Sequence, residues 1–291
     1  MYIIMHIYTG VQRKWVARMI QDIYPSKLNN NYMDYKMTAE DYVIWFNAEG
    51  KAYVRIGDEQ IGFATGSDVK EASAVYLFSV DEKKFFLVLG EVSFLNPEYG
   101  YYSVRELRDR CSGKELFAVF SAYHLWRWYT DNQYCGRCAC RLELGKIERS
   151  LVCPLCGNVV YPRINPAVIV GVTKGEKLLI TRYRKGYAHN ALVAGFTEFG
   201  ETLEETVARE VMEETGVKVK NIRYYKSQPW GMAQDILVGF FCEADGEGNI
   251  HMDESELKYA EWVSREDIVL QPNNLSLTNE MIKVFKEGKD F

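Results

Sequence analysis

The chain has 291 residues, 47% of them hydrophobic and 26% charged, which is an ordinary globular composition with length for two or three domains. Its formal net charge of −5 excludes the overall basic surface that nucleic-acid-binding domains carry. The first residues lack the charged region and cleavage site of a secretory signal, and the longest aliphatic run, 167–172, is far too short to cross a bilayer. We therefore expect a cytoplasmic protein without a membrane-spanning segment.

Residues 1–130 are expected to form an α+β domain. The first strand is expected at 1–11, and alternating, aromatic-rich segments predict further strands at 41–46, 51–56, 74–78 and 84–89. From 104 to 130 the apolar residues recur at helical spacing, so this stretch is expected to be helical. This part contains no motif that indicates chemistry.

Four cysteines follow as two C-x2-C pairs separated by 14 residues. They are Cys135, Cys138, Cys153 and Cys156. Each pair fits a tight knuckle, and four thiolates complete the closed tetrahedron of a structural zinc site. The alternative, two redox or disulfide pairs, requires an oxidising compartment that the chain shows no signal for. We therefore expect a zinc ribbon over 131–163, with Cys140 as a spare thiol.

Residues 164–291 are expected to form an α/β domain. Predicted strands lie at 167–172, 177–181, 191–194, 222–228 and 235–242, and a final helix spans 277–286. A further helix is predicted over 203–215, because Thr202 and Glu205 form a capping box before it and Gly216 stops it.

The segment 195–217 carries the pattern on which the functional prediction depends. It reads G-x5-E-x7-R-E-U-x-E-E-x-G-U, where U is aliphatic. Gly195 begins a loop whose backbone can approach a ligand closely, and Glu201 leads from that loop into the helix. Arg209 lies four residues before Glu213 and can orient an acid.

Three acids of this helix lie on one face. Glu210, Glu213 and Glu214 are i+3 and i+4 neighbours, so their Cβ atoms are about 5–6 Å apart. Carboxylates this close repel one another unless a proton or a cation lies among them, and hard oxygen ligands suit Mg²⁺ or Mn²⁺. The alternative is an acidic, solvated helix face, but the glycines and the arginine also occupy the positions of the pattern.

The complete pattern resembles the signature of the Nudix hydrolases. The resemblance implies an α/β/α sandwich with a mixed sheet, and hydrolysis of a nucleoside diphosphate linked to another group. It also implies that Glu210, Glu213 and Glu214 bind the catalytic metal, with Glu201 in support.

Three further features narrow the resemblance. A four-cysteine ribbon precedes the pattern, the joining segment 161–166 reads YPRINP, and residues 227–230 read SQPW. Together they resemble the NADH pyrophosphatase subfamily, which implies hydrolysis of NAD(H) to nicotinamide mononucleotide and AMP, removal of NAD caps from RNA, and a homodimer. The subfamily continues with P-F-P-x-S, whereas 231–235 read GMAQD here, which leaves the preference between NADH and NAD⁺ open.

A dinucleotide offers two flat rings and one pyrophosphate, and aromatic side chains stack on such rings. The candidate substrate-binding residues lie in the joining segment, at the start of the pattern or in the SQPW turn, and are Tyr161, Gly195, Phe196, Ser227, Gln228 and Trp230. For the aromatic members, core filling is the alternative.

The subfamily also carries an acid ahead of a tryptophan downstream of the pattern. Glu256 lies six residues before Trp262 and matches that position, so we expect a metal ligand or general base there. Two alternatives stay open: another Nudix activity, on ADP-ribose or a diadenosine polyphosphate for example, and a regulator whose ribbon binds nucleic acid while the box senses a nucleotide.

Overall fold

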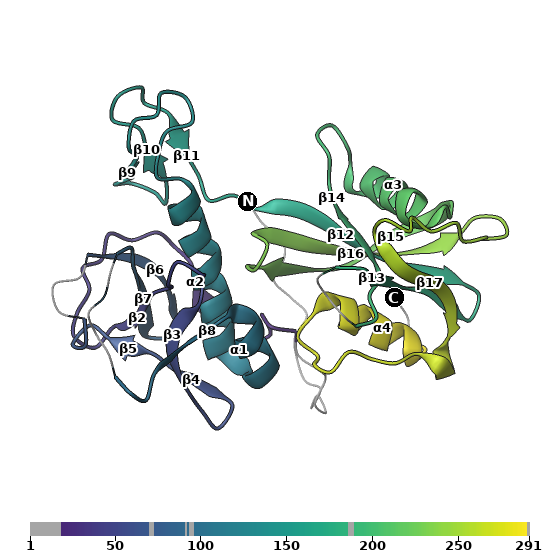
Figure 1. The fold of residues 1–291 in the computed structure, drawn as a ribbon, viewed down its shortest axis with the longest axis horizontal. Coiled ribbons are helices and arrows are strands. Elements are labelled where there is room, and N and C mark those ends of the chain that lie inside the picture. Colours follow the sequence, from purple (N-terminus) through teal and green to yellow (C-terminus); the bar gives the residue numbers. More distant parts are fainter. Residues whose placement is uncertain (1–18, 70–72, 91, 93–95, 186–188, 290–291) are drawn as a thin grey trace, which may run out of the picture.

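The computed structural model describes residues 19–69, 73–90, 92, 96–185 and 189–289. These residues form two lobes, with the ribbon standing on the N-terminal lobe (Figure 1). The strand expected at 1–11 lies outside the described residues. None of the described helices is long and apolar enough to span a membrane.

The N-terminal lobe has two sheets around a long helix. The larger sheet has the order β1 (Leu28–Asn29), β6 (Ala74–Val80), β7 (Lys83–Val88), β2 (Tyr42–Ile44), β5 (Ala64–Thr65). The smaller one has the order β4 (Gln60–Gly62), β3 (Ala52–Gly57), β8 (Gly100–Tyr102). The helical stretch is two helices, α1 (Val104–Arg110) and α2 (Gly113–Asp131), because Cys111 and Ser112 between them have extended backbone angles.

The ribbon continues directly from α2 as three short strands, β9 (Glu143–Leu144), β10 (Leu151–Val152) and β11 (Val159–Val160). Its buried residues Leu142, Leu151 and Cys153 belong to the same apolar core as Trp128 of α2. The division of the chain at 130/131 and 163/164 therefore stays a prediction, since the first boundary crosses a shared core.

The C-terminal lobe is a mixed sheet between two helices. The strand order is β15 (Val219–Trp230), β16 (Asp235–Ala244), β12 (Asn165–Lys174), β13 (Lys177–Tyr183), β17 (Leu257–Ser264), and β14 (Val193–Phe196) also pairs with β12. The pairing of β12 with β16 is parallel and the other pairings are antiparallel. Helix α3 (Leu203–Thr215) covers one face and α4 (Leu277–Lys286), after the short 3-10 turn η1 (Arg265–Asp267), covers the other (Figure 1).

Alternation along β12 explains the two layers. Val168 and Val170 share one buried cluster with Val207 of α3, whereas Ile169 shares another with Met281 of α4. Successive side chains of a strand point to opposite faces, so one apolar strand supports both helices. The predicted α/β/α sandwich with a mixed sheet is confirmed.

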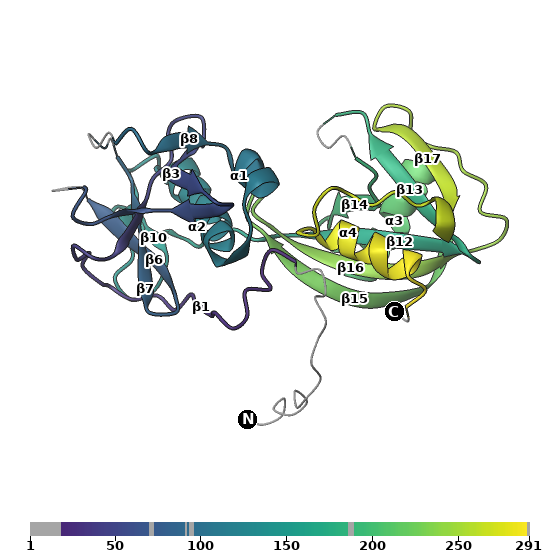
Figure 2. The ribbon, with the colours of Figure 1, turned by 90° about the horizontal axis from the view of Figure 1, so that it is seen from below.

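The two lobes meet at the turn between β15 and β16. This end of the two strands reaches the lobe that holds α2 (Figure 2). A Cβ on Gly231 would lie 2.2 Å from the carbonyl oxygen of Phe120, so only glycine allows this approach. The ring of Trp230 packs on Phe120 with centroids 5.4 Å apart. The altered turn after SQPW thus forms part of the contact between the lobes.

Candidate active site

The start of α3 is set by local hydrogen bonds. The Thr202 hydroxyl accepts from the amide of Glu205 at 3.2 Å, and the Glu205 carboxylate accepts from the amide of Thr202 at 2.8 Å. Gly216 ends the helix with a φ of 70°, in the left-handed region. Both ends of the predicted helix are confirmed, and with them the positions of its acids.

Arg209 lies at the centre of the acidic residues. Its guanidinium donates to Glu201 at 2.6 and 2.9 Å, to Glu210 at 2.8 Å and to Glu213 at 3.0 Å. It also donates to the carbonyl of Phe196 at 3.0 Å, which ties α3 to the end of β14. The hydrogen bond from Arg209 is the main reason that the pKa of Glu201 falls to about 2.

Glu210 is packed against the glycine that begins the motif. A Cβ on Gly195 would lie 1.9 Å from the carboxyl carbon of Glu210, so the side chain occupies the space that any other residue would fill. Burial raises the pKa of Glu210, while Arg209 opposes that rise.

Glu214 is the most buried acid of the group, with 3% of its surface exposed. Its carboxylate oxygens lie 2.9 and 3.0 Å from the hydroxyl of Tyr183, which in turn accepts a hydrogen bond from the amide of Ala194 at 3.0 Å. Burial raises the pKa of Glu214 to about 8, Tyr183 lowers it, and the charges of Glu210 and Glu256 raise it further.

Tyr183 was not identified from the sequence. Leu179 of the same strand packs in the cluster under α3, so the alternation of β13 places Tyr183 on the α3 side of the sheet. That alternation is the signal that would have identified it.

The downstream acid joins the group from the loop before β17. Glu256 is exposed, and its charge acts on both Glu210 and Glu214. The carboxylates are neighbours but are not gathered into a tight cage. Among the described residues, only the four cysteines place three or more candidate ligand atoms within 4.8 Å of one another. Arg209 holds Glu213 outward, whereas Tyr183 holds Glu214 inward.

The candidate substrate residues fall into two groups. Phe196 is 51% exposed at the end of β14 and follows Gly195, beside Arg209. Tyr161 is 55% exposed on the ribbon side, where its hydroxyl donates to Glu148 at 2.7 Å. Ser227 and Trp230 lie on β15, and the ring of Trp230 is used against Phe120.

The structure does not bring Gln228 to the acids. Gln228 is fully buried, and its amide donates to Gln21 at 2.8 Å and to the carbonyl of Leu275 at 2.9 Å. Its amide oxygen accepts from the backbone of Leu277 at 2.8 Å. Because these bonds use both ends of the amide, Gln228 anchors α4 in this arrangement and has no free group for a substrate.

Asp235, in the segment 231–235 that departs from the subfamily sequence, is buried at the start of β16. It pairs with Trp230 on one side and with Asn165 on the other. Burial raises its pKa to about 7, and its Oδ1 has no hydrogen-bond partner among the described residues.

The four cysteines meet as a metal site requires. The sulfur atom of Cys138 lies 3.4 Å from that of Cys153 and 3.5 Å from that of Cys156. The sulfur atoms of Cys135 and Cys156 are 3.6 Å apart. A tetrahedral Zn²⁺ with Zn–S bonds of ~2.3 Å separates its sulfurs by roughly 3.8 Å, whereas a disulfide needs ~2.05 Å. The cluster therefore fits a structural metal, and Cys140 lies outside it.

The comparisons with known proteins agree with this geometry. The NUDIX domain family matches residues 162–286. A NAD-capped RNA hydrolase NudC from Citrobacter koseri is 33% identical over 86% of this chain and 96% of its own length. One from Shigella flexneri is 40% identical over 62% of this chain and 70% of its own. A solved NUDIX hydrolase from Nitrosomonas europaea shares 20% identity over 53% of this chain and 91% of its own, at a TM-score of 0.46.

The sandwich and its motif define a Nudix hydrolase, and the chain belongs to the Nudix family. Its relatives of 33% to 40% identity carry the name NAD-capped RNA hydrolase NudC. Membership of this family implies the use of a divalent metal.

Proposed function

We propose that this protein hydrolyses the pyrophosphate of NAD(H) to nicotinamide mononucleotide and AMP, and that it removes NAD caps from RNA. The names of its relatives and the acids around Glu214 support the proposal. The observation that carries it is the buried carboxylate of Glu214 beside Glu210, in the loop–helix segment that the family uses for catalysis.

The residues present fit a divalent cation. Glu214 is buried, no recorded ion pair neutralises it among the described residues, and it lies within range of the charges of Glu210 and Glu256, so a cation bound among these acids would be stabilised. Glu210, Glu213, Glu214 and Glu256 are the proposed ligands of Mg²⁺ or Mn²⁺. When bound, such a cation neutralises pyrophosphate charge and lowers the pKa of a coordinated water.

The protein's own groups have separate roles in this proposal. Arg209 orients Glu201, Glu210 and Glu213 through the hydrogen bonds described above. Glu256, which is exposed, accepts a proton from the attacking water. A new bond forms between the water oxygen and one phosphorus, the bridging P–O bond breaks, and the other phosphate leaves with its nucleoside.

Further parts of the proposal concern binding and assembly. Phe196, exposed beside the acids, is proposed to stack on a substrate ring, with Gly195 allowing close approach. Tyr161, Ser227 and Trp230 are proposed to contribute through a homodimer, because Tyr161 bonds to Glu148 of the ribbon and the ring of Trp230 packs on Phe120 of α2. The cysteine cluster is proposed to hold Zn²⁺ as a structural ion, and the protein is proposed to act in the cytoplasm.

The test is a comparison of Glu214→Gln and Glu213→Gln with wild type at saturating Mg²⁺. Loss of a metal ligand or base is expected to lower turnover on the order of 10²–10⁴-fold. Glu204→Gln is the matched control, since Glu204 is an exposed acid in the first turn of the same helix and lies outside the cluster. Near wild-type turnover of both variants would refute the assignment.

The substrate is tested separately with NADH, NAD⁺, ADP-ribose and NAD-capped RNA under Mg²⁺ and under Mn²⁺. We expect the highest kcat/KM among the NAD-containing substrates. A clear preference for ADP-ribose would keep the chemistry but reject the proposed substrate.

A further inference from the structure

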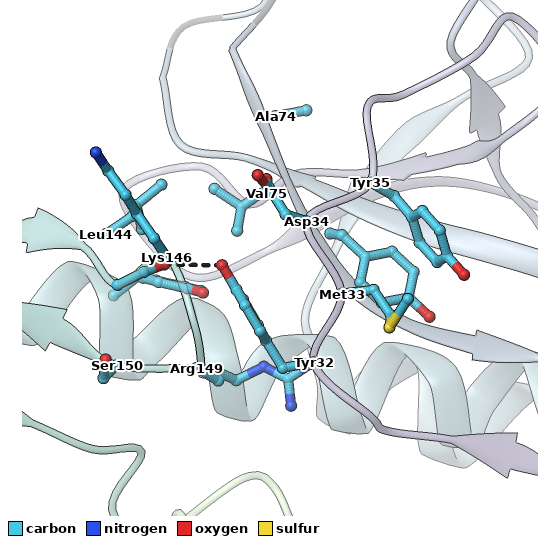
Figure 3. A pocket seen from close by; sticks show the side chains of 13 residues that line it. Tyr32, Met33, Asp34, Tyr35, Ala74, Val75, Leu144, Lys146, Arg149 and Ser150 are labelled. Carbon is cyan, nitrogen blue, oxygen red and sulfur yellow. Dashed lines mark hydrogen bonds between the residues drawn. The ribbon is translucent and has the colours of Figure 1, made fainter.

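A second concave site lies away from the acids, where the ribbon meets the N-terminal lobe. It is a half-open cavity of about 250 Å³ between the segment 32–35, the start of β6, Tyr129 of α2 and the ribbon residues 144–146 and 149–150. Figure 3 shows the lining side chains, with Arg149 beside Tyr32. Four of the lining residues are tyrosines: Tyr32, Tyr35, Tyr76 and Tyr129.

The lining includes a positively charged side chain, Arg149, that has no acidic partner among the described residues. Arg149 is partly buried, and burial lowers its pKa. No carboxylate lies within 4.0 Å of its guanidinium among the described residues, and its Nε has no hydrogen-bond partner there. A guanidinium without a carboxylate partner is a favourable place for an anion to bind.

The guanidinium is nevertheless held in place. It donates to the backbone carbonyl of Asn30 at 3.2 Å and to that of Leu77, which fixes it in the wall of the cavity. Tyr32 is held as well, because its hydroxyl donates to the carbonyl of Gly145 at 2.8 Å (Figure 3). The site is therefore preorganised for a ligand with an acceptor and a negative charge.

Tyr129 and Lys146 add a hydroxyl and a second positive charge to the lining. Tyr129 is buried, its pKa is raised to about 12 by burial, and its hydroxyl has no recorded hydrogen-bond partner among the described residues. Lys146 is exposed at the rim, and Asp34, also exposed, is the one acid of the lining. With Arg149 and Lys146 against Asp34, the lining has a net charge of +1.

We propose that this cavity binds a nucleoside monophosphate. The phosphate pairs with Arg149 and Lys146, and the base lies against Tyr32 and Tyr35, the less buried tyrosines of the lining. A volume of about 250 Å³ suits a mononucleotide better than an intact dinucleotide. The site is separate from the acids of α3, and its occupancy does not depend on the proposed function.

The experiment is calorimetric titration of the full-length protein with AMP in buffer without Mg²⁺ or Mn²⁺, where the acids of α3 repel a phosphate. Adenosine and inorganic phosphate are the two partial ligands, and each is expected to bind at least tenfold more weakly than AMP. A 5′-phosphorylated dinucleotide, pApA, distinguishes a free nucleotide from the 5′ end of an RNA as the ligand. Affinity equal to that of AMP points to an RNA end, and weaker affinity points to the free nucleotide.

Three variants locate the binding. Arg149→Met, Lys146→Met and Tyr129→Phe are each expected to weaken AMP binding, the first by at least tenfold. Arg141→Met is the control, because Arg141 is an exposed arginine of the same ribbon outside the cavity. Lys146 is exposed and Tyr129→Phe removes one hydroxyl, so these two remain informative even when Arg149→Met fails to fold. Absence of AMP binding, or affinity within twofold of wild type in both Lys146→Met and Tyr129→Phe, overturns the proposal.

Discussion

The hydroxyl of Tyr183 lies 2.9 and 3.0 Å from the two carboxylate oxygens of Glu214 and is the one side-chain group recorded in contact with them among the described residues. The residues are 31 positions apart, on β13 and α3. The amide of Ala194 donates to the same hydroxyl, whose recorded acceptors are the carboxylate at 2.9 Å and the carbonyl of Ala194 at 3.4 Å, so the carboxylate is the nearer acceptor. Tyr183 thus orients the most buried acid of the site.

Tyr183→Phe is expected to weaken activation by metal. Without the hydroxyl, the pKa of Glu214 rises further above about 8, so less of the carboxylate is ionised at neutral pH and more Mg²⁺ is needed. We expect kcat/KM to fall roughly 10- to 100-fold, with the Mg²⁺ concentration for half-maximal activity raised and the loss partly recovered at higher pH. Tyr259→Phe is the control, because Tyr259 lies on the neighbouring strand β17 and donates to Asn190 at 2.7 Å. An unchanged Mg²⁺ dependence would contradict the role given to Tyr183.

Gly195→Ala is expected to disturb the site without unfolding the protein. The added Cβ would fall 1.9 Å from the carboxyl carbon of Glu210, so that carboxylate must move away from its present place beside Arg209. We expect a loss of activity on the order of 10²-fold, since small displacements of catalytic groups are costly, with circular dichroism unchanged. Gly57→Ala serves for comparison, because a Cβ there meets no atom within 4 Å. Equal activities of the two variants would show that the packing of Glu210 on Gly195 is unimportant.

Loss of the ribbon metal is expected to destabilise the N-terminal lobe. Cys153 lies in the same core as Trp128, so an empty cluster leaves unpaired thiols beside buried apolar residues. Cys153→Ser should abolish the one zinc per chain expected from metal analysis and lower stability by roughly 3 kcal/mol or more, or about 10 °C in Tm. Cys140→Ser, outside the cluster, should retain both zinc and Tm. Full zinc content in Cys153→Ser would disprove the ligand set.

Asp235→Asn is expected to remove a pH-dependent loss of stability. The pKa of Asp235 is raised by burial from 3.8 to about 7, so the folded protein binds this proton more tightly than the unfolded chain. Stability from this group is therefore complete below about pH 4 and declines as the pH rises towards 7. The Asn variant should be more stable than wild type at pH 8 by a few kcal/mol, with about 4 kcal/mol as the upper bound. Urea unfolding at pH 5 and pH 8 measures this, and an equal difference between the proteins at both values would contradict it.

Short-range features of this protein were predictable because neighbouring residues determine them. The capping box of Thr202 and Glu205 and the C-terminal stop at Gly216 are local hydrogen-bond and backbone properties, and the helix ends where they predict. The C-x2-C spacing predicted the gathering of four thiols for the same reason, since each knuckle is one tight turn. The break at Cys111 and Ser112 was missed, because the helical period of the apolar residues continues through it.

Contacts between distant segments were not predictable from spacing. Gln228 stands in the motif that resembles a substrate turn, yet its amide is bonded to Gln21, Leu275 and Leu277. Trp230 was expected at a ligand, and its ring lies on Phe120, over a hundred positions earlier. Each of these outcomes depends on contacts between residues at least 47 positions apart in the chain.

The amino-acid order alone therefore specified the chemistry: acids at helical spacing, glycines before them and paired cysteines, all encoded within a few turns of chain. Tertiary packing decided how that chemistry is tuned. It buried Glu214 of α3 against a tyrosine of β13, left Arg149 without a carboxylate partner among the described residues and placed Asp235 out of water. Burial and long-range hydrogen bonds set the energies of charges, and both arise only when segments far apart in the chain come into contact.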